Sequence, residues 1–284
     1  MILRGRHRLS LCAVSGAFLL AVSCGSTGPQ PPQPGSPAFI WGVARDSYKA
    51  GDYATANENL AKLAQGKSEF ATRAAPIQLL LGTGMAKGYI DLAAKFDTGA
   101  KANRNNPGVF RKQMSAFRSQ ARALSTQTLE TVHQQMNNWK DEKITLAFPF
   151  PAGSLDEVEA LKKVTQGLVM QPSEIDKVAQ EMLQRGVVQV ASRIAGSPKD
   201  AAKAKAAFAA EDIQVPREQF VLAIAGALYE ISDLFSSTKM DEPDKMRQLC
   251  SEALESLESV PQSKERKDLA EKIQKALKKV GGKG

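Results

Sequence analysis

Few side chains in this sequence could carry out chemistry. Its 284 residues include two histidines, and His133 is the one that lies outside the N-terminal segment. This excludes a multi-histidine metal centre, and a Ser-His-Asp or Cys-His catalytic site would depend on that single ring. His133 falls near the end of a predicted long helix, where a lone histidine is typical of a surface position. We therefore expect a protein that is not an enzyme and binds no metal or other cofactor.

The three cysteines lead to the same expectation. Cys12 and Cys24 belong to the N-terminal segment, which leaves Cys250 as the one cysteine of the folded region. An intramolecular disulfide framework cannot be built from it. Cys250 lies on one helical face with Met246 and Ala253, a pattern that indicates a small core residue rather than a nucleophile.

Acidic and glycine-rich segments add no catalytic motif. Two acidic groups fall in the first turns of predicted helices, where the helix dipole favours them, and no pair stands out as a glycosidase site. Leu81–Gly84 and Gly281-Gly282 are not phosphate loops, because no Gly-Lys-Ser/Thr follows the first and the second lies almost at the end of the sequence. The two acidic groups are Asp156, Glu157 and Glu159, and Asp241, Glu242 and Asp244.

The first 23 residues have the pattern of an export signal. Arg4, Arg6 and Arg8 precede an apolar stretch of 14 residues from Leu9 to Val22. A membrane-spanning helix needs roughly 20 apolar residues, so this stretch indicates a cleaved signal peptide at 1–23.

The end of that stretch, Leu20-Ala21-Val22-Ser23-Cys24-Gly25, resembles the lipobox of bacterial lipoproteins. The resemblance implies that Ser23 is the last residue removed and that Cys24 is lipidated. Ala21 departs from the family pattern, which favours leucine there, and ordinary cleavage near Ala21–Ser23 would instead release a soluble protein. Gly25, rather than aspartate, resembles the sorting pattern of outer-membrane lipoproteins. The expected location is the outer membrane, with the protein facing the periplasm.

Residues 24–38 predict a spacer after the lipidated cysteine. Thirteen residues from Gly25 to Pro37 include five prolines and neither a charge nor a large apolar group. Such a segment stays extended, and at about 3 Å per residue it spans on the order of 40 Å. It could hold a folded body away from a membrane surface.

From Phe39 onward the apolar residues recur at helical spacing, and the strand signal is nearly absent. This predicts an all-α protein of antiparallel helix pairs, with helical regions at 39–139 and 154–284. Residues 140–153 form the connector between them. Pro149 and Pro151 forbid a helix there, and Ile144–Leu146 could form at most a short edge strand.

Two helix pairs are expected before the connector. Gly51-Asp52 separates the apolar stripes around Tyr48 and Tyr53, which predicts a helical hairpin with both rings buried. The next two stripes predict a second pair, broken near Lys87-Gly88 and ended by Asn105-Asn106-Pro107. A longer helix should follow from about residue 108 to 138.

After the connector, Ser154, Ser173 and Ser197 have the pattern of helix N-caps. The first of these helices would carry Val158, Leu161, Val164 and Leu168 on its apolar stripe. We also expect a largely buried helix between Pro216 and Phe235, a helix opened by residues 241–243, and a last helix from about Pro261 to Gly281.

The first hairpin resembles tetratricopeptide-type repeats, because Tyr48, Gly51-x-Tyr53 and Ala56 fall much where that family packs its helix pair. Segments beginning at Leu81 and Asp244 resemble it more loosely. The resemblance covers about a third of the chain and has no sustained 34-residue period. It implies stacked, degenerate repeats, and an irregular helical bundle is the alternative.

The net charge of +8 is unevenly distributed. Three charges belong to the signal segment and residues 264–284 carry five in excess, so residues 24–263 have no net charge. This distribution does not indicate nucleic acid as a partner. Lys272, Lys275, Lys278 and Lys279 are either a solvated helix face or a contact with an anionic surface such as lipid or a cell-wall polymer.

Together these patterns predict a membrane-anchored helical-repeat lipoprotein that acts as a scaffold or adaptor for another protein of the cell envelope. The alternative is a ligand-binding accessory lipoprotein of a periplasmic solute-transport system. An open groove would favour the adaptor, whereas a closed apolar pocket between helices would favour ligand binding. A hydrolase is a third, weaker hypothesis.

Overall fold

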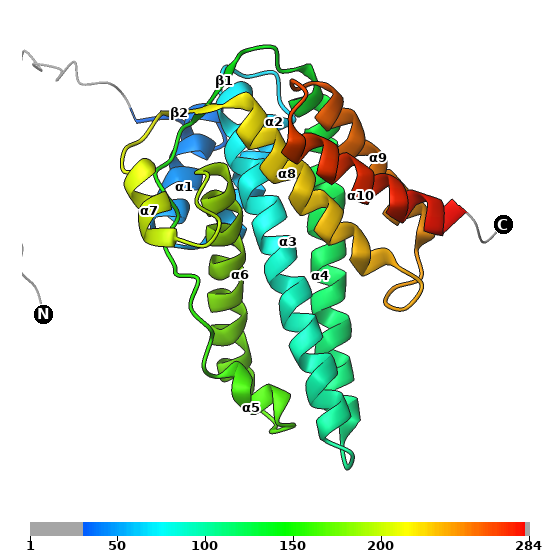
Figure 1. Cartoon of the computed structure of the whole chain (residues 1–284). Coiled ribbons are helices and arrows are strands. Elements are labelled where there is room, and N and C mark those ends of the chain that lie inside the picture. Colours follow the sequence, from blue (N-terminus) through cyan, green and yellow to red (C-terminus); the bar gives the residue numbers. More distant parts are fainter. Residues whose placement is uncertain (1–30, 282–284) are drawn as a thin grey trace, which may run out of the picture. The chain divides into compact units, whose positions relative to one another are not determined.

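The computed structural model describes residues 31–281 and confirms the all-α prediction (Figure 1). Packed helix pairs surround a long central helix, and one two-stranded sheet lies at one end of this region. The helices are α1 (Pro37–Lys49), α2 (Tyr53–Ala64), α3 (Ala71–Ala102), α4 (Pro107–Gln134), α5 (Leu161–Thr165), α6 (Pro172–Ile194), α7 (Ala201–Ala207), α8 (Arg217–Ser232), α9 (Pro243–Glu258) and α10 (Lys264–Gly281), with short 3-10 turns η1 (Met136–Asn138) and η2 (Asp233–Phe235).

Helices α1 and α2 form the predicted hairpin. Gly51 takes a φ of +76°, which favours glycine at this turn, and the Asp52 side chain accepts a hydrogen bond from the Thr55 amide at 3.1 Å. Tyr48 and Tyr53 are 3% and 2% exposed, and their ring centroids lie 5.4 Å apart. The rings therefore pack the two helices together, as the sequence predicted.

Helix α3 is the central element, and the predicted break near Gly88 is wrong. The helix runs unbroken for 32 residues and packs against α4 on one side and α6 on the other (Figure 1). Glycines let α6 approach its backbone closely: a Cβ placed on Gly186 of α6 would lie 2.1 Å from the Gly84 oxygen and 2.8 Å from the Gly88 nitrogen. Gly88 therefore permits close packing and does not end the helix.

The connector forms a short strand where the sequence allowed at most an edge strand, and the partner of this strand, which lies outside the connector, was not predicted. β1 (Lys143–Leu146) pairs in antiparallel fashion with β2 (Ile213–Pro216), with Ile144 opposite Val215. Residues 147–160 then form no helix. Helices before and after the connector contribute to a shared core, because α3 packs against both α4 and α6.

Three predicted helix starts after the connector are corrected. The Ser154 hydroxyl accepts a hydrogen bond from the Asp156 amide in a local turn, and helix begins only at Leu161 in the short α5. Helix α6 starts at Pro172, where Gln171 and Glu174 form the capping box in place of Ser173 and Asp176. Helix α7 starts after Asp200 and not after Ser197. The Asp200 side chain is the N-cap and accepts a hydrogen bond from the Lys203 amide at 2.9 Å.

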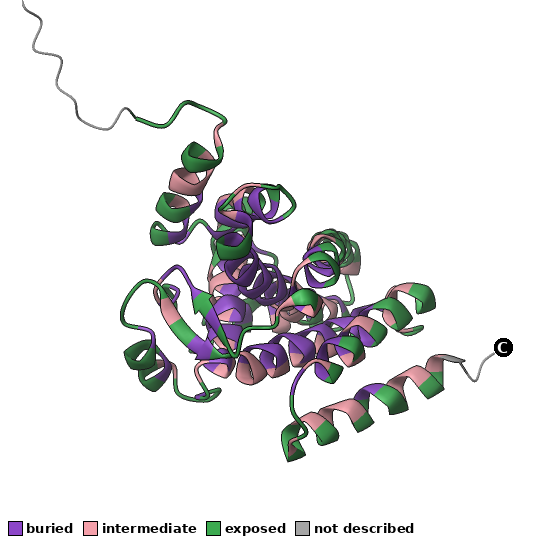
Figure 2. Ribbon diagram, turned by 90° about the horizontal axis from the view of Figure 1, so that it is seen from above, coloured by how far each residue is buried: buried purple, intermediate pink, exposed green. Residues whose placement is uncertain are grey.

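The last three helices follow the prediction closely. α8 is largely buried, α9 begins at Pro243, and α10 runs from Lys264 to Gly281. Nine residues of α8 are buried, whereas Figure 2 shows that the last helix before the C label, α10, is mostly exposed or intermediate.

A half-buried carboxylate joins three of these helices. Glu230 of α8 lies 3.0 Å from the Lys87 ammonium of α3 and 2.7 Å from the Arg193 guanidinium of α6. Burial opposes ionisation of Glu230, but the hydrogen bond from Arg193 and the charges of both cations outweigh it and lower its pKa. The ionised form is therefore the one that stabilises the fold.

This arrangement predicts a specific pH dependence for Glu230→Gln. A lowered folded-state pKa means that the stabilisation is present above the unfolded pKa and is lost as pH falls through the folded value. We expect the variant to be about 1 kcal/mol less stable at pH 7, a modest value because water screens this partly exposed group. Urea unfolding should show the gap closing toward pH 3. Glu58→Gln, which removes an exposed i,i+4 partner of Lys62, is the control and should change stability by less than about 0.5 kcal/mol. A gap that is constant with pH would contradict the role of the Glu230 charge.

Candidate functional site

The predicted lipidation site, Ser23-Cys24, lies outside the described residues. The four predicted surface lysines lie on α10, and all of them are exposed: Lys272, Lys275, Lys278 and Lys279. Cys250 is fully buried, as predicted, and its thiol donates to the Ser232 hydroxyl at 3.3 Å. Burial raises the pKa of this thiol, which disfavours the nucleophilic thiolate.

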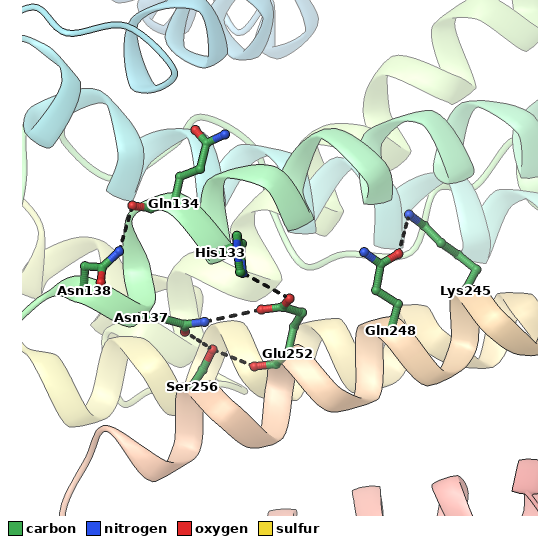
Figure 3. Close-up of polar contacts among 8 residues, drawn as sticks. All are labelled: His133, Gln134, Asn137, Asn138, Lys245, Gln248, Glu252 and Ser256. Atoms are coloured by element: carbon green, nitrogen blue, oxygen red, sulfur yellow. Dashed lines mark hydrogen bonds and ion pairs between the residues drawn. The ribbon is translucent and has the colours of Figure 1, made fainter.

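His133 belongs to a polar contact between α4 and α9 (Figure 3). Its Nδ1 lies 3.5 Å from Glu252 Oε1, and Asn137 Nδ2 donates to Glu252 Oε2 at 3.3 Å. The Ser256 hydroxyl is 2.8 Å from Asn137 Oδ1. The histidine thus contacts the Glu252 carboxylate and not Ser256, and Ser256 is buried. This order of groups joins two helices and does not place the imidazole to take a proton from the hydroxyl.

The connector is held in its extended path by the first hairpin. The Tyr48 hydroxyl donates to the Pro149 carbonyl at 2.7 Å, and the Tyr53 hydroxyl donates to the Ala152 carbonyl at 2.8 Å. Burial raises the pKa of both phenols, so both remain protonated donors at neutral pH. The two tyrosines therefore have a positioning role in addition to packing the hairpin.

α6 and the segment before β2 hold the same stretch from the other side. Arg185 Nε of α6 donates to the Leu155 carbonyl at 3.1 Å, and the Phe150 amide donates to the Phe208 carbonyl at 3.1 Å. Gly153 takes a φ of +126° between these points and lies against the Gln184 side chain. Hydrogen bonds therefore hold residues 149–155, which are not helical, at several separate positions.

Successive parts of this stretch line two open hollows, which we call the apolar hollow and the acidic hollow. The apolar hollow has a volume of about 410 Å³ and lies between the connector and α7. It is lined by Pro149, Phe150, Ala202, Lys205, Ala206, Phe208 and Ala209. Small alanine side chains leave room there for an apolar group from another molecule.

The acidic hollow has a volume of about 360 Å³ and lies between residues 153–159 and α6. Its carboxylates are Asp156, Glu157, Glu159 and Glu181, and Arg185 lines it as well. The sequence had placed the first three in a helix N-terminus, but residues 154–160 form no helix, so the helix dipole does not account for them. We call residues 149–159 with the two hollows the connector surface.

A third surface feature lies where α3, α4 and α5 converge, which we call the tip. Leu168 and Val169 are 53% and 56% exposed, which corrects the prediction of Leu168 on a buried stripe. The Gly167 carbonyl accepts a hydrogen bond from Asn103 Nδ2 at 2.9 Å, so this loop is held against the end of α3. The exposed cations Arg104, Arg111 and Lys112 lie on the adjoining segments.

Within residues 31–281, no helix combines the length and apolar character needed to cross a bilayer. The same residues contain no group of three or more His, Cys, Asp or Glu side chains placed to share a metal ion. Comparisons with protein-family models, with curated proteins and with solved structures find no match to this chain.

Proposed function

We propose that this chain is a non-enzymatic lipoprotein, anchored through Cys24 to the outer membrane and facing the periplasm, that acts as an adaptor for another envelope protein. The observation that carries the adaptor role is the connector surface. There, two buried tyrosines hold an extended segment that lines an apolar hollow and then an acidic one. Open hollows whose lining is held by hydrogen bonds to neighbouring elements are suited to an extended segment of a partner.

The chemistry of the two hollows defines the partner segment. Pro149 lines the apolar hollow and Gly153 lines the acidic hollow. The two residues are four positions apart, which corresponds to about 13 Å in an extended chain. A matching segment carries an apolar side chain for the hollow at Phe150 and lysine or arginine for the carboxylates near Glu157. The openness of both hollows supports an adaptor over the accessory ligand-binding protein, which would enclose its ligand.

Anchoring is tested by Cys24→Ala. In cells fed labelled palmitate, the wild-type chain should carry label in the membrane fraction. The variant should be unlabelled and either soluble in the periplasm or unprocessed. A wild-type chain without label would refute lipidation at Cys24.

Partner binding is tested with a photo-crosslinking residue at Ala206, which is exposed and lines the apolar hollow. Irradiated envelopes should give a discrete protein adduct. Charge reversal by Glu157→Lys with Glu181→Lys should reduce its yield several-fold. The same crosslinker at Ala116, an exposed position on α4 that lines neither hollow, is the control. Adducts of equal yield at Ala206 and Ala116, or a yield unchanged by charge reversal, would overturn the proposed surface.

A further inference from the structure

Helix α10 has two faces of different character. Leu269, Ile273 and Leu277 face the core formed with α8 and α9, and Ile273 is fully buried. Leu269 lies close to α8, because a Cβ on Gly226 would be 3.9 Å from its Cδ2. The apolar side of the amphipathic helix therefore packs against the protein, with Leu269 and Leu277 partly buried, and the opposite side is polar.

The polar side becomes purely basic along the helix. The three acids of α10 are Glu265, Asp268 and Glu271, all in its first half. Beyond them come Lys272, Lys275, Lys278 and Lys279 with no acid among them. Their spacing of three, three and one residues keeps all four on the outward side of the helix.

These four ammonium groups have no ionic partner within the described chain. None of them lies within 4.0 Å of a carboxylate of residues 31–281. By contrast, Lys62, Lys101, Lys162 and Lys239 each have one, and Lys87 has two. A group of unpaired like charges raises the local positive potential, which an external anionic surface would relieve.

We propose that the basic face of α10, formed by these four lysines, is a second membrane contact that binds the headgroups of anionic phospholipids. The inference rests on the proposed lipid anchor. That anchor and its spacer would keep the body within about 40 Å of a bilayer, where even a weak electrostatic contact is repeatedly made. The four lysines lie within about 11 Å along α10 and on one side of it, so they can face a flat surface together. Because the apolar side packs against α8 and α9 and the lysines lie opposite it, the contact is electrostatic and does not require insertion.

The test uses residues 24–284 with Cys24→Ala, which include the whole compact unit Gln33–Gly284 and cannot be acylated at position 24. Binding therefore reports on α10 without the anchor, and failure of lipidation in the palmitate experiment remains a separate result. Co-sedimentation is measured with vesicles of phosphatidylcholine containing 30% phosphatidylglycerol, and with pure phosphatidylcholine. We expect binding to the anionic vesicles alone, lost at high salt.

The decisive variant replaces Lys272, Lys275, Lys278 and Lys279 by glutamine, which keeps helix propensity. Binding should weaken by about tenfold or more. The control replaces Arg104, Arg111, Lys112 and Lys177 by glutamine, which makes the same change in net charge at exposed positions on and near the tip. Circular dichroism shows whether both variants fold.

Three outcomes would overturn the proposal. The first is no binding of the parent chain to anionic vesicles. The second is an equal loss in the α10 and control variants, because net charge alone would then explain binding. The third is binding to a soluble acidic polymer such as polygalacturonate but not to vesicles, which would assign the face to a cell-wall polyanion.

Discussion

Replacing Gly186 by alanine should lower the free energy of unfolding by about 3 kcal/mol. The new methyl carbon would lie 2.1 Å from the Gly84 carbonyl oxygen and 2.8 Å from the Gly88 nitrogen, both of them backbone atoms of α3. A side chain could rotate away from such a contact, but two helix backbones must move apart. That movement would loosen the packing of Val187 and Val190, which are fully buried next to the crossing.

The opposite change is expected at a helical glycine with room around it. Gly226 of α8 has Leu269 Cδ2 at 3.9 Å as the nearest atom to an added Cβ, an ordinary contact. Because alanine is favoured over glycine inside a helix, Gly226→Ala should stabilise the protein by roughly 0.5–1 kcal/mol. Urea unfolding of both variants makes the comparison. Equal effects at the two positions would show that the α3–α6 crossing is not as tight as the structure has it.

Gly88 also shows what a sequence pattern cannot predict. A glycine inside an apolar stripe is consistent with a break or with a close approach, and only the position of a partner helix decides between them. That partner, Gly186, is almost 100 residues away in the sequence. Long apolar stripes were by contrast sufficient to predict α1, α2, α4, α8, α9 and α10. A helix that buries one face has apolar residues at helical spacing in its own sequence.

The prediction of a helix beginning at Ser154 was wrong for a related reason. Ser154 and Glu157 have the spacing of a capping box, but this signal is local and worth about 1 kcal/mol. Hydrogen bonds from Tyr53 to Ala152 and from Arg185 to Leu155 hold the chain on both sides of Ser154 in a path that is not helical. The acidic hollow was therefore not predictable, although three of its four carboxylates, Asp156, Glu157 and Glu159, form an acidic group in the sequence. The tip was missed because Leu168 was assigned to a helix that ends at Thr165.

The early hairpin is where the sequence was most informative, and it supports the strongest prediction about the connector surface. Tyr48→Ala should cost about 3 kcal/mol, because the ring is 3% exposed and packs against Tyr53 and Phe148 with centroid distances of 5.4 and 5.0 Å. The expected observation in urea is a lower midpoint with an unchanged slope. Phe39→Ala is the control in the same helix, because Phe39 is 39% exposed and its loss should change stability by less than about 0.5 kcal/mol.

Tyr48→Phe separates the two functions of this side chain. It keeps the ring but removes the donor to the Pro149 carbonyl, so it should cost about 1 kcal/mol and release the start of the connector. If the tyrosine positions the apolar hollow, Tyr48→Phe should also reduce the Ala206 crosslink while the fold remains intact. A midpoint within error of wild type for Tyr48→Ala would refute the packing role. An unchanged crosslink in Tyr48→Phe would instead confine the tyrosine to packing, because the hollow would then keep its shape without the hydrogen bond.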